Sequence, residues 1–292
     1  MYFGRGADDN TKHRLSKGKE RSMENKVQTG IKKQNTGIRC LSSNALKGIA
    51  CISMLIDHTG IVFFDSNPVM RAVGRLAFPI FAFLIVQGLL HTSDVRRYMG
   101  RLLIFALLSE VPFDLAMYDC IWYPGAQNIF FTLALGLFVI YTFETIGPLR
   151  RWAAEIAFVS ALAAEFLRFD YGMAGIGVIL LFYWCVKERQ AGGRTGEPES
   201  AEGVPEGFSP RLPDGEAVEK AYFGRRQNLE IVLLSSLAYI LCLGMKQLYA
   251  LLAMIPINMY NGKRGRLRLK YVFYLFYPMH LLLIWIIWKN LR

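Results

Sequence analysis

The sequence is dominated by apolar runs of 14 to 21 residues that recur almost to its C-terminus. A hydrocarbon core about 30 Å thick is crossed by roughly 20 apolar residues in a helix, whose backbone polar groups are all bonded internally. A soluble chain of this length would instead carry a largely polar surface. The sequence therefore predicts an all-α, polytopic membrane helix bundle. The nine candidate spans are 46–64, 71–91, 98–118, 128–147, 152–167, 172–187, 229–244, 247–260 and 271–290.

Charge supports this number of spans and orients them. With the N-terminus in the cytoplasm, 27 of the 34 Lys and Arg residues fall in cytoplasmic segments, as the positive-inside rule expects. Deleting one span would put Lys263 to Lys270 outside. We therefore expect a multi-pass protein of the bacterial cytoplasmic membrane with its C-terminus outside. The net charge of +11 is explained by topology, so we expect no nucleic-acid partner.

The chain divides by composition. Residues 1–44 form a basic segment that we expect to be disordered, and Met23 offers a second possible start of translation. Residues 45–188 hold the first six helices, 189–227 a flexible cytoplasmic loop, and 228–292 the last three helices. No small-residue cleavage site follows the first apolar run, so we expect it to remain as a helix. The five cysteines have no metal-binding spacing, and no metal is expected.

Ionisable side chains inside predicted spans are costly unless they face a partner or a wet cavity. Here they gather at one depth, in the outer part of four helices. Because Arg71 and Arg75 are one turn apart, as are Glu110 and Asp114, we expect these two pairs to neutralise each other around an outward-facing polar cavity. Buried salt bridges that only hold the bundle together are the alternative. The polar positions are Asp57, His58, Arg71, Arg75, Glu110, Asp114, Asn128 and Thr132.

His58 differs from the other polar residues because a histidine readily accepts a proton near neutral pH. Its other interpretation is a hydrogen bond to a neighbouring helix. Asp57 points about 100° away from it, so we expect an orienting carboxylate from another helix. His280 is expected at about mid-depth of the last helix. A structural hydrogen bond to an adjacent helix and a role in the reaction explain it equally well. For His91 we favour a helix cap over a phosphate contact.

Four segments carry a resemblance to a known family: LKGIACISMLIDHTGIVFF, RAVGRLAFPIFAFLIVQGLLHT, RLLIFALLSEVPFDLA and NIFFTLALG. They resemble the TraX family over about residues 46–140. The closing FYLFYPMHLLLIW is similar to the last helix of that family and of other membrane acyltransferases. The layout more distantly resembles the heparan-glucosaminide acetyltransferase group, in which a first-helix histidine supports acetyl transfer.

The resemblance implies an acetyl-CoA-dependent transferase of the kind that acetylates the pilin N-terminus in conjugation systems. The positions that match the family's motifs are Asp57 and His58 in IDH, Arg75 in GRLAFP, Glu110 and Asp114 in SEVPFD, and Asn128. On the cytoplasmic side, Lys47, Arg96, Arg97 and Arg101 are placed to hold the phosphates of acetyl-CoA, although positive-inside charge alone also explains all four.

Two functions follow as hypotheses. In the first, an acetyl group passes from acetyl-CoA to an amine or hydroxyl on a pilin, glycan or envelope molecule, with His58 as general base or acyl carrier and Asp57, Glu110 and His280 beside it. In the second, Asp57, His58 and Glu110 form the proton relay of a transporter or export subunit. The sequence leaves the acceptor and the oligomeric state open.

Overall fold

The computed structural model describes residues 40–145, 147–192, 245–265 and 269–292, and within these ranges every regular element is a helix. The helices are α2 (Ser43–Phe63), α3 (Pro68–Gly74), α4 (Ala77–His91), α5 (Val95–Tyr118), α6 (Ile129–Glu144), α7 (Pro148–Arg151), α8 (Ala153–Phe166), α9 (Gly172–Gly192), the 3-10 helix η1 (Met245–Ala253), α12 (Met254–Asn258) and α13 (Lys270–Leu291). The expected all-α class is confirmed for the residues described.

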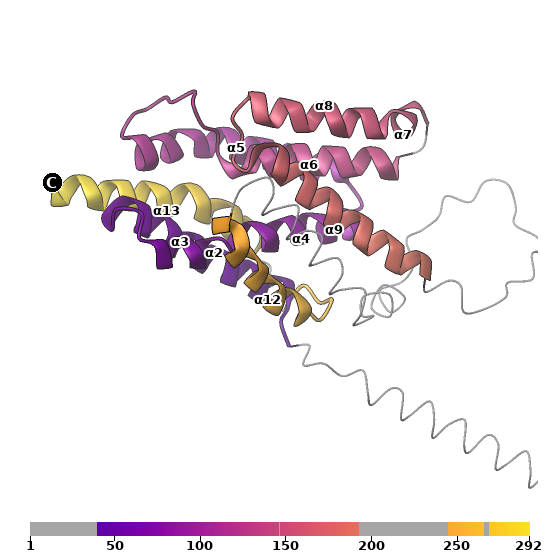
Figure 1. The fold of residues 1–292 in the computed structure, drawn as a ribbon, viewed down its shortest axis with the longest axis horizontal. Helices are drawn as coiled ribbons and strands as arrows, with labels where there is room; N and C mark the ends of the chain where they lie inside the picture. Colours follow the sequence, from indigo (N-terminus) through magenta and orange to yellow (C-terminus); the bar gives the residue numbers. More distant parts are fainter. Residues whose placement is uncertain (1–39, 146, 193–244, 266–268) are drawn as a thin grey trace, which may run out of the picture. The chain divides into compact units, whose positions relative to one another are not determined.

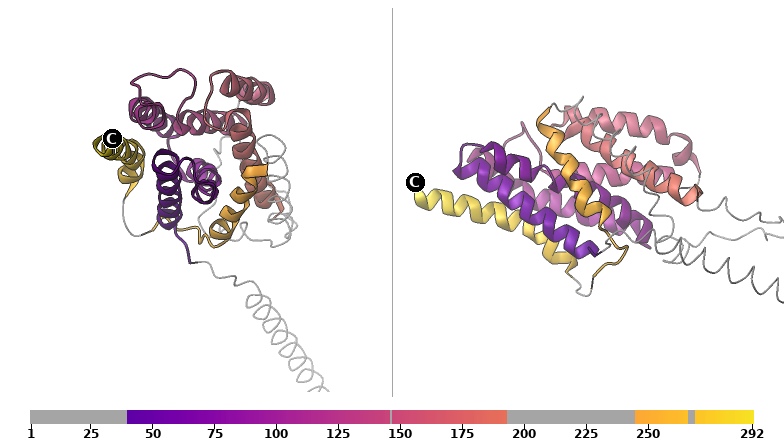
Figure 2. Two further views of the ribbon diagram at one scale, coloured as in Figure 1. Left: turned by 60° about the vertical axis from the view of Figure 1, so that its left-hand side comes forward. Right: turned by 60° about the horizontal axis from the view of Figure 1, so that its bottom comes forward.

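The helix α4 forms the centre of the bundle. It contacts α2, α6, α9 and η1, and its Phe78, Ile80 and Val86 are among the largest fully buried side chains. Helix α13 packs against α5 and α2, and both views of Figure 2 show it lying beside α2. The first and last described helices are therefore neighbours although they are far apart in the sequence (Figure 1).

The outer faces of the helices are apolar. Leu107 is 69% exposed, Phe158 65% and Phe166 85%, and exposed patches of this kind mark contact with lipid or with another protein. By length and composition, three helical segments of the described residues could cross a membrane: Ser43–Phe63, Pro68–His91 and Tyr271–Leu291. Ile129–Glu144 and Leu248–Asn258 are apolar but shorter. The chain is a membrane protein.

Two predicted spans are not single α-helices. The second is interrupted at Arg75 and Leu76, between α3 and α4. Pro79 explains the break, because it has no N–H to donate to the Arg75 carbonyl and its ring crowds that group. The eighth begins as the 3-10 helix η1 and continues as α12. Pro112, in contrast, lies within α5 without interrupting it.

The boundaries of the ordered chain also differ from the expected ones. Leu41 already donates to the Met259 carbonyl and accepts from the Asn261 N–H, and Ser42 caps α2 by accepting from the Ala45 N–H. The last residues of the segment expected to be disordered are thus part of the fold. Helix α9 continues to Gly192, into the expected loop. The rest of both segments, and the seventh span at 229–244, lie outside the described residues.

Hydrogen bonds between distant segments define the two ends of the bundle. At one end, the start of α2 is bonded to the segment before α13, through Leu41 with Met259 and Ser43 with Lys263. At the other end, Asp119, which follows α5, accepts hydrogen bonds from Trp285 and Lys289 near the end of α13. Helix α13 therefore runs the length of the bundle, from the end where α2 starts to the end where α5 stops.

Candidate functional site

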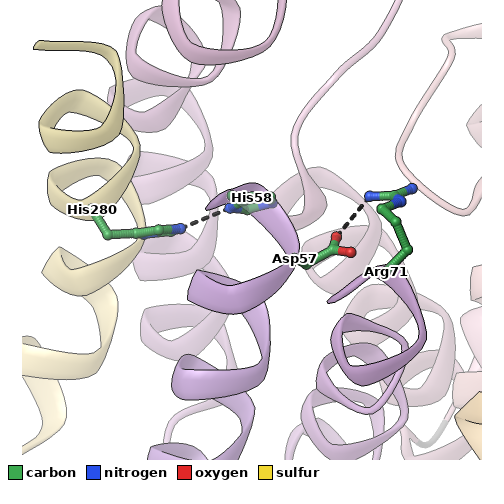
Figure 3. A network of polar contacts seen from close by, with 4 residues as sticks. All are labelled: Asp57, His58, Arg71 and His280. Atoms are coloured by element: carbon green, nitrogen blue, oxygen red, sulfur yellow. Dashed lines mark hydrogen bonds and ion pairs between the residues drawn. The ribbon is translucent and has the colours of Figure 1, made fainter. Parts of the chain in front are cut away.

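A pair of histidines joins α2 to α13. His58 Nδ1 lies 2.8 Å from His280 Nε2, and the two rings stack with their centroids 5.0 Å apart and their planes 10° from parallel. Figure 3 shows the two side chains facing each other, while Asp57 turns away toward Arg71. The expected orienting partner of His58 does come from another helix, but it is a histidine and not a carboxylate.

The hydrogen-bond network assigns the protons of this pair. His280 Nδ1 lies 2.8 Å from the Phe276 carbonyl oxygen, which can only accept, so His280 carries its proton on Nδ1. In the neutral ring Nε2 then has a lone pair and accepts from His58 Nδ1–H. His58 Nε2 is consequently without a proton. No described residue bonds to it, and His58 is only half-buried, so the structure leaves a proton acceptor accessible.

Asp57 and Arg71 form an ion pair on the other side of α2. The Arg71 guanidinium donates to Asp57 Oδ2 at 2.8 Å, and both side chains are largely enclosed. A Cβ added at Gly74 would lie 2.3 Å from Asp57 side-chain atoms, so glycine lets α3 approach α2 this closely. The expected pairing of Arg71 with Glu110 or Asp114 is therefore wrong. The break at Arg75 separates α3 from α4, and α3 lies against α2.

Glu110 and Asp114 instead face the start of α6. The Asn128 side-chain amide donates to Glu110 Oε2 and, at 2.8 Å, to the Ala106 carbonyl, while its oxygen caps α6 by accepting from the Phe130 N–H. Asp114 accepts from the Tyr123 N–H at 2.9 Å. These groups are buried, and they tie α5, the following loop and α6 together.

Arg75 lies at the break between α3 and α4 and bonds to Tyr171, with Asp170 and Asp57 nearby. The expected Arg75 partner, Glu110 or Asp114, is therefore wrong as well. Asp170 and Tyr171 form the turn before α9. Tyr171 has φ 65°, a strained conformation for a bulky residue, and its ring stacks on Phe78 with centroids 4.1 Å apart.

Asp170 was missed by sequence reasoning because it lies in a short turn. Surrounding protein desolvates its carboxyl and raises its pKa from 3.8 to about 6, against the opposing effect of Arg75, although the residue keeps an accessible surface. Its N–H donates to the Gln127 carbonyl at 3.0 Å and its carbonyl accepts from the Thr132 hydroxyl. The available signal was that the predicted topology puts this turn on the same side as the other polar groups.

Tyr277 was also missed, since it was grouped with the aromatic residues that pack α13. It is one turn before His280 on the same helix face. Its ring meets those of His58 and His280 edge-on, with centroids 6.2 and 5.6 Å away. Its hydroxyl accepts from the Ile129 N–H, at the start of α6. Tyr277 thus bridges the histidine pair and the α5–α6 cluster.

The four basic residues expected to hold phosphates separate into two pairs. Arg101, on α5, lies over the Tyr98 ring at 5.7 Å and bonds to Tyr274 of α13, while its Nε is buried without a partner among the described residues. Lys47, on α2, lies 5.5 Å from the ring centroid of Phe273, the neighbour of Tyr274. Both therefore flank the start of α13.

The other two basic residues, Arg96 and Arg97, are exposed. Arg97 pairs at 3.0 Å with Asp94, the N-cap of its own helix. His91 lies at the same end of the bundle, and its Nδ1 donates to the Gln87 carbonyl at 2.8 Å, consistent with the expected cap. No cluster of three His, Cys, Asp or Glu side chains within the described ranges could hold a metal ion.

Comparisons with known proteins give a consistent result. The family profile described as TraX protein matches residues 42–196 and 220–288. The chain is 25% identical to the probable fimbrial assembly protein FimC, serogroup H1, of Dichelobacter nodosus over 271 residues, which cover 83% of this chain and 94% of that protein. It is 29% identical to protein TraX of Escherichia coli over 139 residues, 47% of this chain and 54% of that protein.

Protein TraX of Escherichia coli strain K12 is 30% identical over 132 residues, 45% of this chain and 51% of TraX. The matches thus span about half the length of the two TraX proteins but nearly all of the fimbrial assembly protein. No solved structure matches the chain significantly.

Proposed function

The chain belongs to the TraX family, and from that premise we propose that it is a membrane-embedded acetyltransferase. It moves an acetyl group from cytoplasmic acetyl-CoA to an amine or hydroxyl on the outer side of the bacterial cytoplasmic membrane. The match to a fimbrial assembly protein over nearly its whole length favours a pilin as the acceptor, ahead of a glycan or another envelope molecule.

The observation that carries the proposal is the accessible Nε2 of His58. Acyl transfer needs a group that takes the proton of the attacking nucleophile, and a neutral imidazole nitrogen with no other partner can do so. His280 accepts a hydrogen bond from His58 Nδ1–H and so fixes the orientation of the His58 ring. The aspartate of a Ser-His-Asp triad holds its histidine in the same way. His280 is a positioning residue here, because both of its nitrogens are engaged.

The reaction can be written for an amine acceptor. The nitrogen lone pair attacks the thioester carbonyl carbon, the carbonyl electrons move to oxygen, and His58 Nε2 takes a proton from the nitrogen. The carbonyl then re-forms, the carbon–sulfur bond breaks, and the sulfur leaves with the bonding pair and receives the proton from His58. Direct transfer of this kind requires no acyl-enzyme, so His58 acts as general base and then as general acid.

The cosubstrate would enter from the end of the bundle that holds Lys47 and Arg101. These two positively charged side chains flank the start of α13, and a guanidinium and an ammonium are suited to phosphate oxygens. Lys47 and His58 are eleven residues apart on α2, about 17 Å at 1.5 Å per residue. A thioester arm that follows α2 from the phosphate end would therefore approach His58.

The proposal includes the nine-span topology with the C-terminus outside. The positive-inside count supports it, and so do the hydrogen bonds that define the two ends of the bundle. The start of α2 is bonded to the lysine- and arginine-rich segment before α13, while the end of α13 lies with Asp119 at the opposite end. Reporter fusions after Lys263 and after Arg292 should accordingly report opposite sides of the membrane.

A proton relay for transport receives less support. Asp57 is paired with Arg71 and Glu110 with Asn128, and no hydrogen bond among the described residues joins either carboxylate to His58. The relay would need a connection through these groups. The histidine pair also ends at a backbone carbonyl, which cannot pass a proton on.

The experiment uses the purified full-length chain in detergent or vesicles, with acetyl-CoA and a peptide that has a free N-terminal amine. We expect saturable release of CoA that depends on the peptide, together with one acetyl group gained by the peptide in mass spectrometry. A peptide with a blocked N-terminus is the control. An absence of CoA release, together with proton-driven uptake by vesicles, would establish the transport alternative instead.

A further inference from the structure

Tyr277 is the tyrosine whose ring packs against both histidines of the pair, with centroids 6.2 and 5.6 Å from those of His58 and His280. Tyr277 is only 3% exposed, and its ring is held edge-on against Phe130, His58 and His280. A buried tyrosine usually finds a partner for its hydroxyl, and this one accepts from the Ile129 N–H. No described residue accepts the Tyr277 O–H, so this donor is available.

The position of the hydroxyl gives that donor its significance. The Ile129 N–H belongs to the first residue of α6, where the aligned peptide dipoles carry partial positive charge. A hydroxyl that accepts a bond from this helix end becomes a stronger donor, because the bonds of such a chain polarise one another. The developing charge in acyl transfer is an oxyanion, which needs donors of this kind.

We propose that Tyr277 is a second catalytic residue, whose O–H donates a hydrogen bond to the oxyanion formed when the acceptor attacks the thioester. This inference rests on the proposed acetyl transfer. His58 and Tyr277 then divide the work: the imidazole takes the proton of the nucleophile, and the hydroxyl stabilises the charge that moves to the carbonyl oxygen. As the carbonyl re-forms, the electron pair returns from oxygen to carbon and the sulfur leaves, so Tyr277 keeps its proton throughout.

The arrangement also accounts for the sequence spacing on α13. Residues three apart lie on the same helix face, so Tyr277 and His280 are presented together toward α2. Tyr274, one further turn back, lies on that face too, and it bonds to Arg101. One face of α13 would thus carry three residues in order: Tyr274, which contacts Arg101 near the phosphates; Tyr277, the donor to the oxyanion; and His280, which orients His58.

Tyr277→Phe tests the inference, because it removes the hydroxyl and keeps the ring. We expect kcat to fall about 10²-fold to 10³-fold, the usual loss for one oxyanion donor, with unchanged KM for acetyl-CoA and for the peptide. The matched control is Tyr183→Phe. Tyr183 is equally buried, but its hydroxyl donates to Glu144 at 2.8 Å, on the far part of α6. This control should lose some thermal stability and keep its kcat.

The outcomes separate the two proposals. An active wild type with an equally active Tyr277→Phe would overturn the role of Tyr277 alone, whereas an inactive wild type would overturn the proposed function as well. A variant whose activity falls only as its folded fraction falls would show a packing role. If Tyr277→Phe does not fold, 3-fluorotyrosine at position 277 keeps the fold and makes the hydroxyl more acidic. The alkaline limb of the rate profile should then move to lower pH, and an unmoved limb would contradict the inference.

Discussion

Two polar regions of the bundle, the α5–α6 cluster and the histidine pair, differ in how their side chains are hydrogen bonded. In the α5–α6 cluster, buried Glu110 and Asn128 are bonded to each other and to the backbone. In the histidine pair, one nitrogen of a half-buried ring has no partner among the described residues. Buried hydrogen bonds such as those of Asn128 add rigidity, whereas an accessible lone pair adds reactivity. Glu110 Oε1 and Asp114 Oδ1 also lack a partner among the described residues, but both atoms are buried. What distinguishes His58 is an unpartnered nitrogen on a ring that is only half-buried, and this is why we propose it as the catalytic residue.

The largest effect should come from removing the accessible nitrogen. His58→Ala is expected to lower kcat about 10²-fold to 10⁴-fold, the usual contribution of proton transfer, with little change in coenzyme binding because Lys47 and Arg101 are at the other end of α2 and α5. His58→Gln should be as inactive as His58→Ala. The control is His91→Ala, which removes a histidine that only caps its helix and should retain activity. A folded His58→Ala enzyme with near wild-type turnover would end the assignment.

The α5–α6 cluster should respond in stability instead. Asn128→Ala removes the cap of α6, worth about 1 kcal/mol, and leaves buried Glu110 Oε2 with only the 3.5 Å bond from the backbone N–H of residue 128, at a further cost of about 1–3 kcal/mol. Thermal unfolding in detergent measures the loss. Asn67→Ala, which removes the cap of α3 without stranding a carboxylate, is the control and should lose only the cap contribution. Equal losses in the two variants would show that the Glu110 contact contributes nothing.

A smaller effect on stability should come from the close approach of α3 to α2. This contact packs against Asp57, the residue next to His58. Gly74→Ala places a methyl group 2.3 Å from Asp57, and overpacking of this kind typically costs about 1–3 kcal/mol. Activity should fall as well, because Asp57 adjoins His58 on α2. Gly48→Ala, on α2 and with nothing within 4 Å of the added Cβ, is the control and should be neutral or slightly stabilising. A Gly74→Ala protein of wild-type stability would contradict the packing.

The smallest effect concerns pH and Asp170, which lies near both regions. Its folded pKa of about 6 exceeds the ordinary 3.8, so the native state binds the proton more tightly than the unfolded chain. Its contribution to stability is therefore present below pH 4 and is lost as the pH rises to about 6. Asp170→Asn should flatten this part of the curve of melting temperature against pH. An unchanged curve would show that water screens the carboxyl.

The sequence was sufficient for the helical class, because apolar length and helical periodicity are local properties. It placed His58 and Glu110 in helices but did not predict their partners. The partner of a polar side chain depends on how its helix is rotated and on where the helix is interrupted. The interruption before Pro79 separates α3 from α4, and Arg71 on α3 then pairs with Asp57. Asp170 and Tyr277 were missed because a turn and an aromatic cluster have ordinary structural explanations. Only the packing of distant segments distinguishes them.

The contact between His58 and His280 spans 222 residues of sequence, and this separation has a consequence for biogenesis. A ribosome adds about 5–20 residues per second, so roughly 10 to 45 seconds pass between synthesis of the two histidines. During that time His58 already sits in its helix without the ring that orients it. On the proposed function, the reactive centre would therefore be assembled only when α13 has been made, and shorter intermediates of synthesis would lack both His280 and Tyr277.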